Sequence, residues 1–311
     1  MLSLCILRVN SSSSSARRGV LCYSARVNIQ ENHPLAKYTT YQIGGPADFF
    51  VEAASEAEVI EALEWAAERD MPVFVFGGGS NLLFDDAGFR GLVIRLRAQD
   101  VAVAGERVSA AAGVMMAKVV KAAAEAGLTG IEAWNGLPGT VGGAVVGNAG
   151  CFGVEVKDVL ESARVWMPGE GVREVGPEFF DYDYRSSRLK KETGIVLSAT
   201  FLLKRGEAAA IAAAMENVAR SRIQKQPPGC STGSFFKNPP GDHAGRLIEA
   251  AGLKGKILGG AQISPQHANF FLNRGGATAA DLLALSKLAQ DEVQKQFGVT
   301  LHQEVVFVPE D

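Results

Sequence analysis

The chain has 311 residues, with 31 basic and 34 acidic side chains and a formal net charge of −3 at pH 7. This length is enough for a full hydrophobic core and is typical of two domains rather than one. The near balance of charge excludes a broad basic surface that wraps nucleic acid, so any anionic ligand must be held by a local group of residues.

The cysteines and histidines form no recognisable site. The four cysteines include no C-x-x-C pair and have no histidine at metal-ligand spacing, so we expect neither a disulfide framework nor a metal centre. No apolar run approaches the roughly 20 residues that a helix needs to cross a bilayer. We therefore expect a protein of a reducing compartment, without a bound metal, a nucleic-acid partner or a membrane span.

Residues 1–26 differ in kind from the rest of the chain. They contain four arginines and the serine run Ser11–Ser15, and no acidic residue occurs before Glu31. This composition is typical of an organelle transit peptide; the alternative is an upstream extension or a misassigned start, with the folded chain beginning near Val27. In both cases we expect residues 1–26 to be disordered and outside the fold.

A strand, a helix and a strand are predicted at the start of the folded chain. The strands are 48–52 and 72–76, and the helix begins at Ser55, which forms a capping-box pattern with Glu58. Pro72 limits the end of the helix. Its predicted buried face consists of Val59, Ile60, Leu63 and Ala67.

The middle of the chain is predicted to be mostly strands, at 92–96, 101–108, 164–167 and 195–203. An alanine-rich helix is expected at 115–126, ended by Gly127. Residues 131–153 are too broken by Gly and Pro for a long helix and too apolar for a solvated linker. We expect them to form a loop packed on a ligand.

A change in composition at Arg205 marks the last third of the chain. Helices are predicted there at 207–223, 244–251 and 278–297, and strands at 268–272 and 304–308. No G-x-G-x-x-G motif joins a strand to a helix, so we expect no Rossmann domain. The predicted class is α+β, with a mixed-sheet cofactor domain at 27–205 that divides near residue 98, and a smaller substrate domain at 206–311.

Two glycine-rich segments indicate a phosphate-bearing cofactor. Residues 77–81 (GGGSN) follow an apolar strand and can offer consecutive N–H groups, with the Ser80 hydroxyl, to a diphosphate. Taken alone, this segment is equally well a turn between strands. A second segment at 138–143 favours the cofactor, because two such loops can embrace an extended dinucleotide.

Arg185 and Glu304 are candidates for holding charge. The planar guanidinium of Arg185 suits a carboxylate or a phosphate, although a surface ion pair with Asp181 or Asp183 is the alternative. Glu304 precedes an apolar strand, where burial would raise its pKa; the alternative is a solvated acid at the end of a strand.

Ser234 is a candidate proton donor. It lies between Gly233 and two phenylalanines, and no histidine is near enough in sequence to argue for a nucleophile. An ordinary hydroxyl gives up a proton only to a strongly basic carbanion or beside a cation such as Lys237. The alternative is a turn serine that bonds to its own backbone.

Six motifs in this order resemble the UDP-N-acetylenolpyruvoylglucosamine reductase family of peptidoglycan synthesis. They are TTYQIGGPA at 39–47, GGGSNLL at 77–83, LPGTVGGA at 137–144, YRSS at 184–187, GSFFKNP at 233–239 and EV at 304–305. Each motif is modest alone, but their order over residues 30–310 is highly specific. The short interval between the YRSS and GSFFKNP motifs resembles the second type of the family, which lacks an extra tyrosine-bearing loop.

The resemblance implies an FAD-binding fold of the PCMH, or vanillyl-alcohol-oxidase-like, kind with a smaller C-terminal α/β substrate domain. It implies that NADPH reduces non-covalently bound FAD, which passes hydride to C3 of UDP-N-acetylglucosamine enolpyruvate to give UDP-N-acetylmuramate. Ser234 is then the donor of the proton to C2, and Arg185 and Glu304 stabilise the enolate-like intermediate. Glu304 must be protonated or paired to avoid opposing that charge.

The resemblance also implies binding residues and a cellular setting. The substrate contacts are Tyr184, Lys225, Lys237 and Asn238. The implied setting is a monomer in the cytoplasm that serves cell wall biogenesis, cell shape and cell division, with a plastid or another organelle as the alternative location. The implied FAD contacts are Thr40, Ile43, Gly44, Gly77, Gly78, Gly79, Ser80, Asn81, Leu82, Pro138, Gly139, Thr140, Gly142, Gly143 and Asn148.

Two other functions are alternatives to this one. A flavin-dependent alcohol oxidase of the same fold often tethers FAD through a histidine beside the glycine loop, and none lies between Gly77 and Asp86. A catalytically silent nucleotide-sugar binder has no need of Arg185, Ser234 and Glu304 together.

Overall fold

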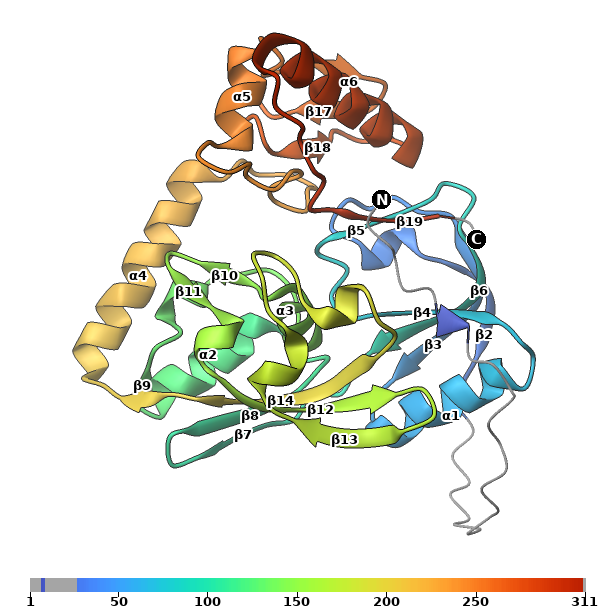
Figure 1. Cartoon of the computed structure of the whole chain (residues 1–311), viewed down its shortest axis with the longest axis vertical. Helices are drawn as coiled ribbons and strands as arrows, with labels where there is room; N and C mark the ends of the chain where they lie inside the picture. The colour runs from blue at the N-terminus through green and yellow to red at the C-terminus, as the bar shows by residue number, and fades with distance from the viewer. Residues whose placement is uncertain (1–6, 9–26, 310–311) are drawn as a thin grey trace.

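The structure is a computed structural model that describes residues 7–8 and 27–309. Two five-stranded sheets form the lower body of the molecule in Figure 1, and a smaller C-terminal unit stands above them. The long helix α4 (Ala208–Lys225) runs along one edge and joins the two parts. The arrangement agrees with the predicted α+β class.

The first sheet has the strand order β1-β4-β6-β3-β2, with a parallel centre and antiparallel edges. The sequences of its central strands are almost continuously apolar, as expected for strands covered on both faces. Its strands are β1 (Leu7–Arg8), β2 (Gln30–Pro34), β3 (Pro46–Ala53), β4 (Pro72–Phe76) and β6 (Phe89–Leu96).

Strand β1 qualifies the expectation that residues 1–26 lie outside the fold. Leu7 and Arg8 pair antiparallel with the edge strand β4, because β4 has unpaired backbone groups on that side. The rest of the predicted extension, and with it the transit-peptide hypothesis, lies outside the described residues.

Helix α1 (Glu56–Ala67) begins as predicted, since the Ser55 hydroxyl accepts the Glu58 N–H. Its buried face differs from the prediction, because the helix turns its small alanines toward the sheet. Ile60 and Ala67 are only partly buried. The buried residues are Val59, Ala62, Leu63 and Ala66.

The second sheet is antiparallel, in the order β13-β12-β14-β8-β7. The single strand predicted at 101–108 is in fact two strands, because Gly105 turns the chain back with a positive φ of 64°. The strands are β7 (Val101–Ala104), β8 (Arg107–Ala111), β12 (Leu160–Met167), β13 (Gly171–Val175) and β14 (Ile195–Leu202).

The predicted loop at 131–153 contains a short helix, α3 (Val141–Gly147), that packs against β14. Its glycines disfavour a helix, but Val141, Ala144 and Val145 form a buried stripe at helical spacing, and packing outweighs propensity. Helix α2 (Met116–Glu125) and the 3₁₀ turn η3 (Glu132–Trp134) precede it.

Short elements complete the body. The strands are β5 (Leu82–Phe84), β9 (Leu128–Thr129), β10 (Gly150–Cys151), β11 (Val154–Glu155) and β15 (Lys204–Arg205). The 3₁₀ turns are η2 (Ala36–Tyr38), η4 (Val156–Asp158), η5 (Pro177–Phe180) and η6 (Arg188–Lys190).

The C-terminal unit packs two helices beside a three-stranded sheet. Its core also contains Tyr41, Ile43 and Leu83, which belong to the body. The division between residues 205 and 206 stays a prediction. The elements are α5 (Ala244–Ala250), β16 (Ile257–Leu258), β17 (Ala261–Ile263), β18 (Phe271–Asn273) and α6 (Ala279–Phe297).

The last strand, β19 (Val306–Val308), leaves the C-terminal unit and returns to the body (Figure 1). It pairs in parallel with β5, with Val306 opposite Leu82. The segment just before β19 is therefore held where the two parts of the molecule meet. Strand β19 begins at Val306, two residues later than the predicted start at residue 304.

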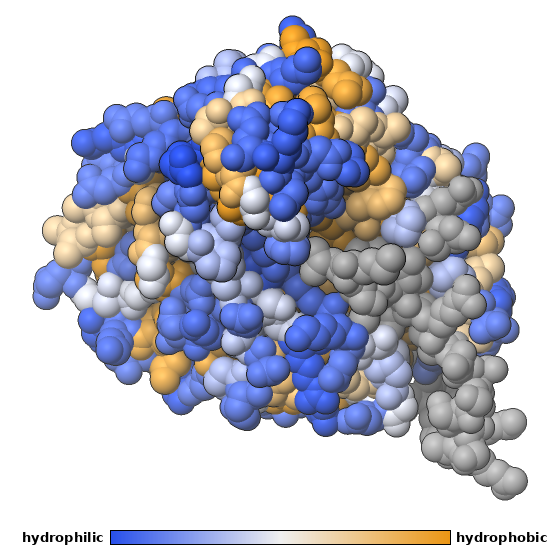
Figure 2. Space-filling model, turned by 45° about the horizontal axis from the view of Figure 1, so that its top comes forward, coloured by the Kyte–Doolittle hydropathy of each residue, from blue (hydrophilic) through white to orange (hydrophobic). Residues whose placement is uncertain are grey.

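Hydrophilic side chains predominate on the face shown in Figure 2, and hydrophobic ones lie in scattered groups among them. No helix within residues 7–8 and 27–309 has the length and apolar character needed to span a membrane.

A second connection between the two parts is made by Asp86, which follows β5. Its carboxylate accepts the N–H groups of Ala279 at 2.8 Å and Ala280 at 3.1 Å, the first two residues of α6. The Thr278 hydroxyl accepts the next free N–H, that of Asp281. Asp86 thus completes the cap of a helix that belongs to the other unit.

We expect Asp86→Ala to lower the free energy of unfolding by about 1 kcal/mol, the usual value of a helix cap. Urea denaturation followed by circular dichroism measures this change. Asp291→Ala is the matched control, because Asp291 lies on the exposed side of the same helix and pairs with Lys287; it should change stability by less than about 0.5 kcal/mol. Equal effects of the two substitutions would contradict the cap.

Candidate active site

The two glycine-rich segments meet in the body of the molecule. A Cβ atom added to Gly77 would lie 2.0 Å from the Thr140 hydroxyl oxygen, and one added to Gly139 would lie 2.9 Å from the Ser80 hydroxyl oxygen. A side chain at Gly77 would displace Thr140, and the φ of 109° at Gly139 favours glycine there. The structure therefore brings the two predicted cofactor loops together, although they are far apart in sequence.

These loops present polar groups that need a partner. Among the described residues, no acceptor bonds the backbone N–H groups of Gly78, Gly79 and Ser80. The Thr40 hydroxyl is buried and has no hydrogen-bond partner, while the Thr40 N–H donates to the Gly79 carbonyl at 3.2 Å. Buried polar groups without partners are costly, and free N–H groups in a row suit a diphosphate.

Other predicted cofactor residues have structural contacts. Ile43 lies in the core of the C-terminal unit, and Gly44 is held against the side chain of Phe84. Gly142 packs on Ala112, so a side chain there would clash. Leu82 pairs with β19, Pro138 lies in the loop before Thr140, and Gly143 lies in the first turn of α3.

Asn148 uses its whole side chain within the protein. Its amide nitrogen donates to the Glu155 carboxylate and to the Asp183 carbonyl, and its oxygen accepts the Lys157 N–H. Asn148 therefore holds the loops around it, and its backbone has the left-handed conformation (φ 43°) that asparagine tolerates.

Arg185 and Glu304 form an ion pair at the junction of the two units. The distance from Arg185 Nε to Glu304 Oε1 is 3.0 Å, and the two side chains are 23% and 21% exposed. Arg185 Nη2 also donates to the Gly150 carbonyl at 2.7 Å. Arg185 therefore does not pair with Asp181 or Asp183, the alternative that sequence reasoning left open.

The backbone at Arg185 is strained. Its φ of 53° lies in the left-handed region, which costs a non-glycine residue of order 1 kcal/mol or more. Its carbonyl accepts hydrogen bonds from Lys190 Nζ at 2.8 Å and from Lys237 Nζ at 3.4 Å. Two ammonium groups thus stabilise the turn that points the guanidinium at Glu304.

Glu304 is fixed by its backbone. Its N–H donates to the Phe235 carbonyl at 2.8 Å, and its carbonyl accepts the Asn81 amide at 2.9 Å. Burial raises the pKa of the Glu304 carboxyl above its usual value, against the opposing attraction of Arg185, Lys190 and Lys237. Through Asn81, the acid is tied directly to the first glycine loop.

Ser234 lies in a rigid segment beside Glu304. The next residue, Phe235, is buried and donates its N–H to the Asn269 carbonyl at 2.7 Å, and the Asn269 side chain bonds the backbone of Phe236. Among the described residues, the Ser234 hydroxyl has no hydrogen bond, which differs from a turn serine bonded to its own backbone. It is free to meet a ligand.

Comparisons with known proteins agree with this geometry. Residues 223–308 match the family described as UDP-N-acetylenolpyruvoylglucosamine reductase, C-terminal domain, and residues 47–176 match an FAD binding domain. The reductase of Chloroflexus aurantiacus is 45% identical over 288 residues, which cover 90% of this chain and 97% of that protein. The reductase of Pediococcus pentosaceus is 42% identical over 289 residues, covering 92% and 96%.

The chain belongs to the UDP-N-acetylenolpyruvoylglucosamine reductase family.

The solved structures agree. The reductase (MurB) of Thermus caldophilus superposes with a TM-score of 0.79 at 38% identity, over 91% of this chain and 99% of that one. Together with the FAD-domain match, this confirms the predicted fold, a flavoprotein fold with a reductase-type C-terminal domain. The free N–H groups of the glycine loops and the orphan Thr40 hydroxyl fit the diphosphate of FAD in this reductase family member.

The predicted substrate residues lie on several elements, and of these Tyr184 and Lys237 contact Arg185. Tyr184 is exposed, and the Arg185 guanidinium lies 5.3 Å from the centre of its ring. Lys225 is the exposed last residue of α4. Asn238 is exposed, and its side-chain oxygen accepts the Ala244 N–H at the start of α5.

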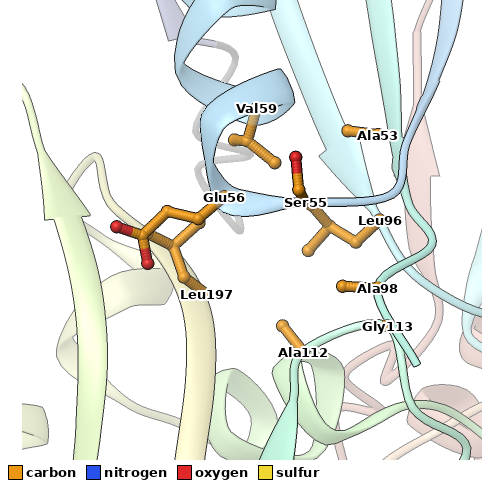
Figure 3. A pocket seen from close by; sticks show the side chains of 9 residues that line it. All are labelled: Ala53, Ser55, Glu56, Val59, Leu96, Ala98, Ala112, Gly113 and Leu197. Atoms are coloured by element: carbon orange, nitrogen blue, oxygen red, sulfur yellow. The ribbon is translucent and has the colours of Figure 1, made fainter. Parts of the chain in front are cut away.

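A pocket of about 490 Å³ adjoins the ion pair. Its walls come from β10, β11 and η4, together with Tyr184 and Arg185. By contrast, the pocket in Figure 3 lies between α1 and the antiparallel sheet and measures about 20 Å³. It holds at most about one water molecule, so it is no part of this reductase site.

Sequence reasoning missed Lys190 as a member of the site. Lys190 is the last residue of η6, and Leu189 beside it is buried while Arg188 and Lys191 are exposed. Burial, with the nearby charges of Lys237 and Arg185, lowers the pKa of Lys190 to about 8, while Glu304 opposes the shift. In the sequence it is one cation among several, so no local pattern distinguishes it.

Proposed function

We propose that this protein reduces UDP-N-acetylglucosamine enolpyruvate to UDP-N-acetylmuramate, with non-covalent FAD and with NADPH as the hydride donor. The observation that carries the proposal is the Arg185–Glu304 ion pair. Glu304 bonds the backbone of Phe235, next to Ser234, and the amide of Asn81 in the first glycine loop. Its place in peptidoglycan precursor synthesis and in the cytoplasm belongs to the same proposal.

The glycine loops are suited to holding the cofactor without a charged side chain. The N–H groups of Gly78, Gly79 and Ser80 would hold the diphosphate, and the Thr40 hydroxyl would supply a further donor. When bound, FAD supplies the redox chemistry by carrying a hydride equivalent from NADPH to C3 of the enolpyruvyl group.

Arg185 stabilises the negative charge that develops on C2 and on the adjoining carboxylate of the substrate. Its guanidinium is already oriented by Glu304 and the Gly150 carbonyl, so it does not have to reorganise during the reaction. Glu304 is neutralised by its pairing with Arg185 and therefore does not oppose that charge.

Ser234 donates its proton to C2. A carbanion next to a carboxylate is basic enough to take a proton from a hydroxyl, and the Lys237 ammonium three residues away favours the alkoxide that is left. Solvent then returns a proton to Ser234. Hydride at C3 and a proton at C2 together complete the reduction of the double bond.

Anaerobic absorbance spectroscopy tests the proposal. The protein purified with FAD is bleached by NADPH, and the flavin band should return only when UDP-N-acetylglucosamine enolpyruvate is added. A band that returns only with oxygen would instead indicate an oxidase. A protein that binds no FAD on reconstitution would indicate a silent nucleotide-sugar binder.

A further inference from the structure

Among the cations at residues 188–191, Lys190 is the one whose side chain is partly buried. Its neighbours Arg188 and Lys191 are exposed, and Arg188 pairs with Glu192 on the surface. The Lys190 ammonium instead donates to the Arg185 carbonyl at 2.8 Å. This bond is local in sequence, because η6 begins three residues after Arg185.

The bond from Lys190 acts on the strained residue of the site. Arg185 has a left-handed backbone, and a left-handed arginine persists only when its surroundings fix it. The Lys190 bond is charge-assisted and shorter than the 3.4 Å contact from Lys237 to the same carbonyl. Lys190 therefore contributes more to holding the Arg185 turn.

The charges of the cluster are unbalanced without a ligand. Arg185, Lys190 and Lys237 are cations and Glu304 is a single carboxylate, so the cluster with Lys190 protonated and Glu304 ionised has an excess of two positive charges. The enolpyruvyl carboxylate brings one negative charge, and hydride addition at C3 brings a second. The excess therefore matches the intermediate better than the bound substrate.

We propose that Lys190 is a positioning residue for the second half-reaction, which holds Arg185 in its left-handed turn and adds the second unit of positive charge. This inference rests on the proposed reductase function. It assigns Lys190 no contact with FAD and no part in flavin reduction by NADPH.

The charge of Lys190 is sensitive to pH near neutrality. Its pKa of about 8 means that the ammonium is present below pH 8 and is lost as the pH rises further. The charged groups that act on it are Arg185, Lys237 and Glu304; of the elements that pack against η6, α3 has no titratable side chain and η5 carries Glu178. A bound substrate anion would raise the pKa of Lys190. The ammonium is therefore lost at a lower pH in the free reduced enzyme than in its complex with substrate.

Stopped-flow absorbance of the FAD-loaded protein tests this role. Each variant is mixed first with NADPH, to record flavin reduction, and then in reduced form with UDP-N-acetylglucosamine enolpyruvate. We expect Lys190→Met to reduce flavin at the wild-type rate and to be reoxidised about 10- to 100-fold more slowly, as for loss of a charged hydrogen bond. Lys191→Met, the exposed neighbour, should match the wild type in both steps.

Lys190→Arg separates charge from shape. Arginine stays protonated at all working pH values, so this variant should keep most of the reoxidation rate at pH 7. The second-order rate of reoxidation should fall above pH 8 in the wild type and should remain level in Lys190→Arg. Binding of UDP-N-acetylmuramate, measured by calorimetry, should be weaker in Lys190→Met and unchanged in Lys191→Met.

The outcomes distinguish the two proposals. Wild-type protein that is not reoxidised by the substrate overturns the reductase function and the role of Lys190 with it. A wild type that is reoxidised, with Lys190→Met as fast as Lys191→Met, overturns only the role of Lys190. Equal slowing of both half-reactions, or an unmoved pH profile in Lys190→Arg, also overturns it.

Discussion

Replacing Ser234 with alanine should leave flavin reduction by NADPH unchanged and slow reoxidation by the enolpyruvyl substrate about a thousandfold. The first step needs no proton from the protein at this position, whereas the second needs one at C2. A well-placed general acid contributes about 10² to 10⁴ in rate. Because the Ser234 hydroxyl has no hydrogen bond among the described residues, its loss should not disturb the surrounding backbone.

Stopped-flow absorbance of the flavin band measures both steps in the same sample. Ser231→Ala is the control, since Ser231 lies three residues earlier in the same segment and outside the proposed site. It should leave both rates unchanged. Rapid reoxidation of Ser234→Ala would mean that another group protonates C2.

The second large effect is expected at Gly79. An added Cβ would lie 1.9 Å from the Tyr38 carbonyl oxygen, and the backbone φ of 62° is unfavourable for alanine. Gly79→Ala must therefore displace the loop whose N–H groups are proposed to hold the diphosphate. We expect loss of bound FAD and a fall in unfolding free energy of about 3 kcal/mol or more, as for overpacking combined with backbone strain.

Gly105 provides a matched control. Its φ of 64° is nearly the same, but a Cβ there would meet nothing within 4 Å. Gly105→Ala should cost about 1 kcal/mol from backbone strain alone and should retain FAD. Flavin content by absorbance and stability by urea denaturation give both quantities. Retention of FAD by Gly79→Ala would contradict the assignment of this loop.

Much of the fold follows from local patterns. Helix α6 was predicted from Thr278 at its start and Gly298 at its end, and the structure has both caps, with Gly298 in the left-handed conformation. Strand β4 and helix α5 were found in the same way. In these elements a few adjacent residues determine the backbone, so a single sequence is sufficient.

The structure differs from the sequence-based predictions mainly where contacts between residues far apart in the chain determine the local structure. Helix α3 forms despite its glycines because β14 covers its apolar stripe, and no local signal reports that cover. The motifs identified Arg185 and Glu304, but only the fold shows that they pair with each other rather than with nearer charges. Lys190 was missed for a different reason, because its partner is near in sequence but is a backbone carbonyl, which no residue type reveals.

The pairing of β19 with β5 has a consequence for the order of assembly during synthesis. Residues 82–84 leave the ribosome early, but their strand partner at 306–308 is made more than two hundred residues later. The glycine loops can thus fold long before Glu304 exists, since domains fold as they emerge. The site is therefore completed only when residues 304–308 are made and β19 pairs with β5, although the other residues of the glycine loops are made much earlier.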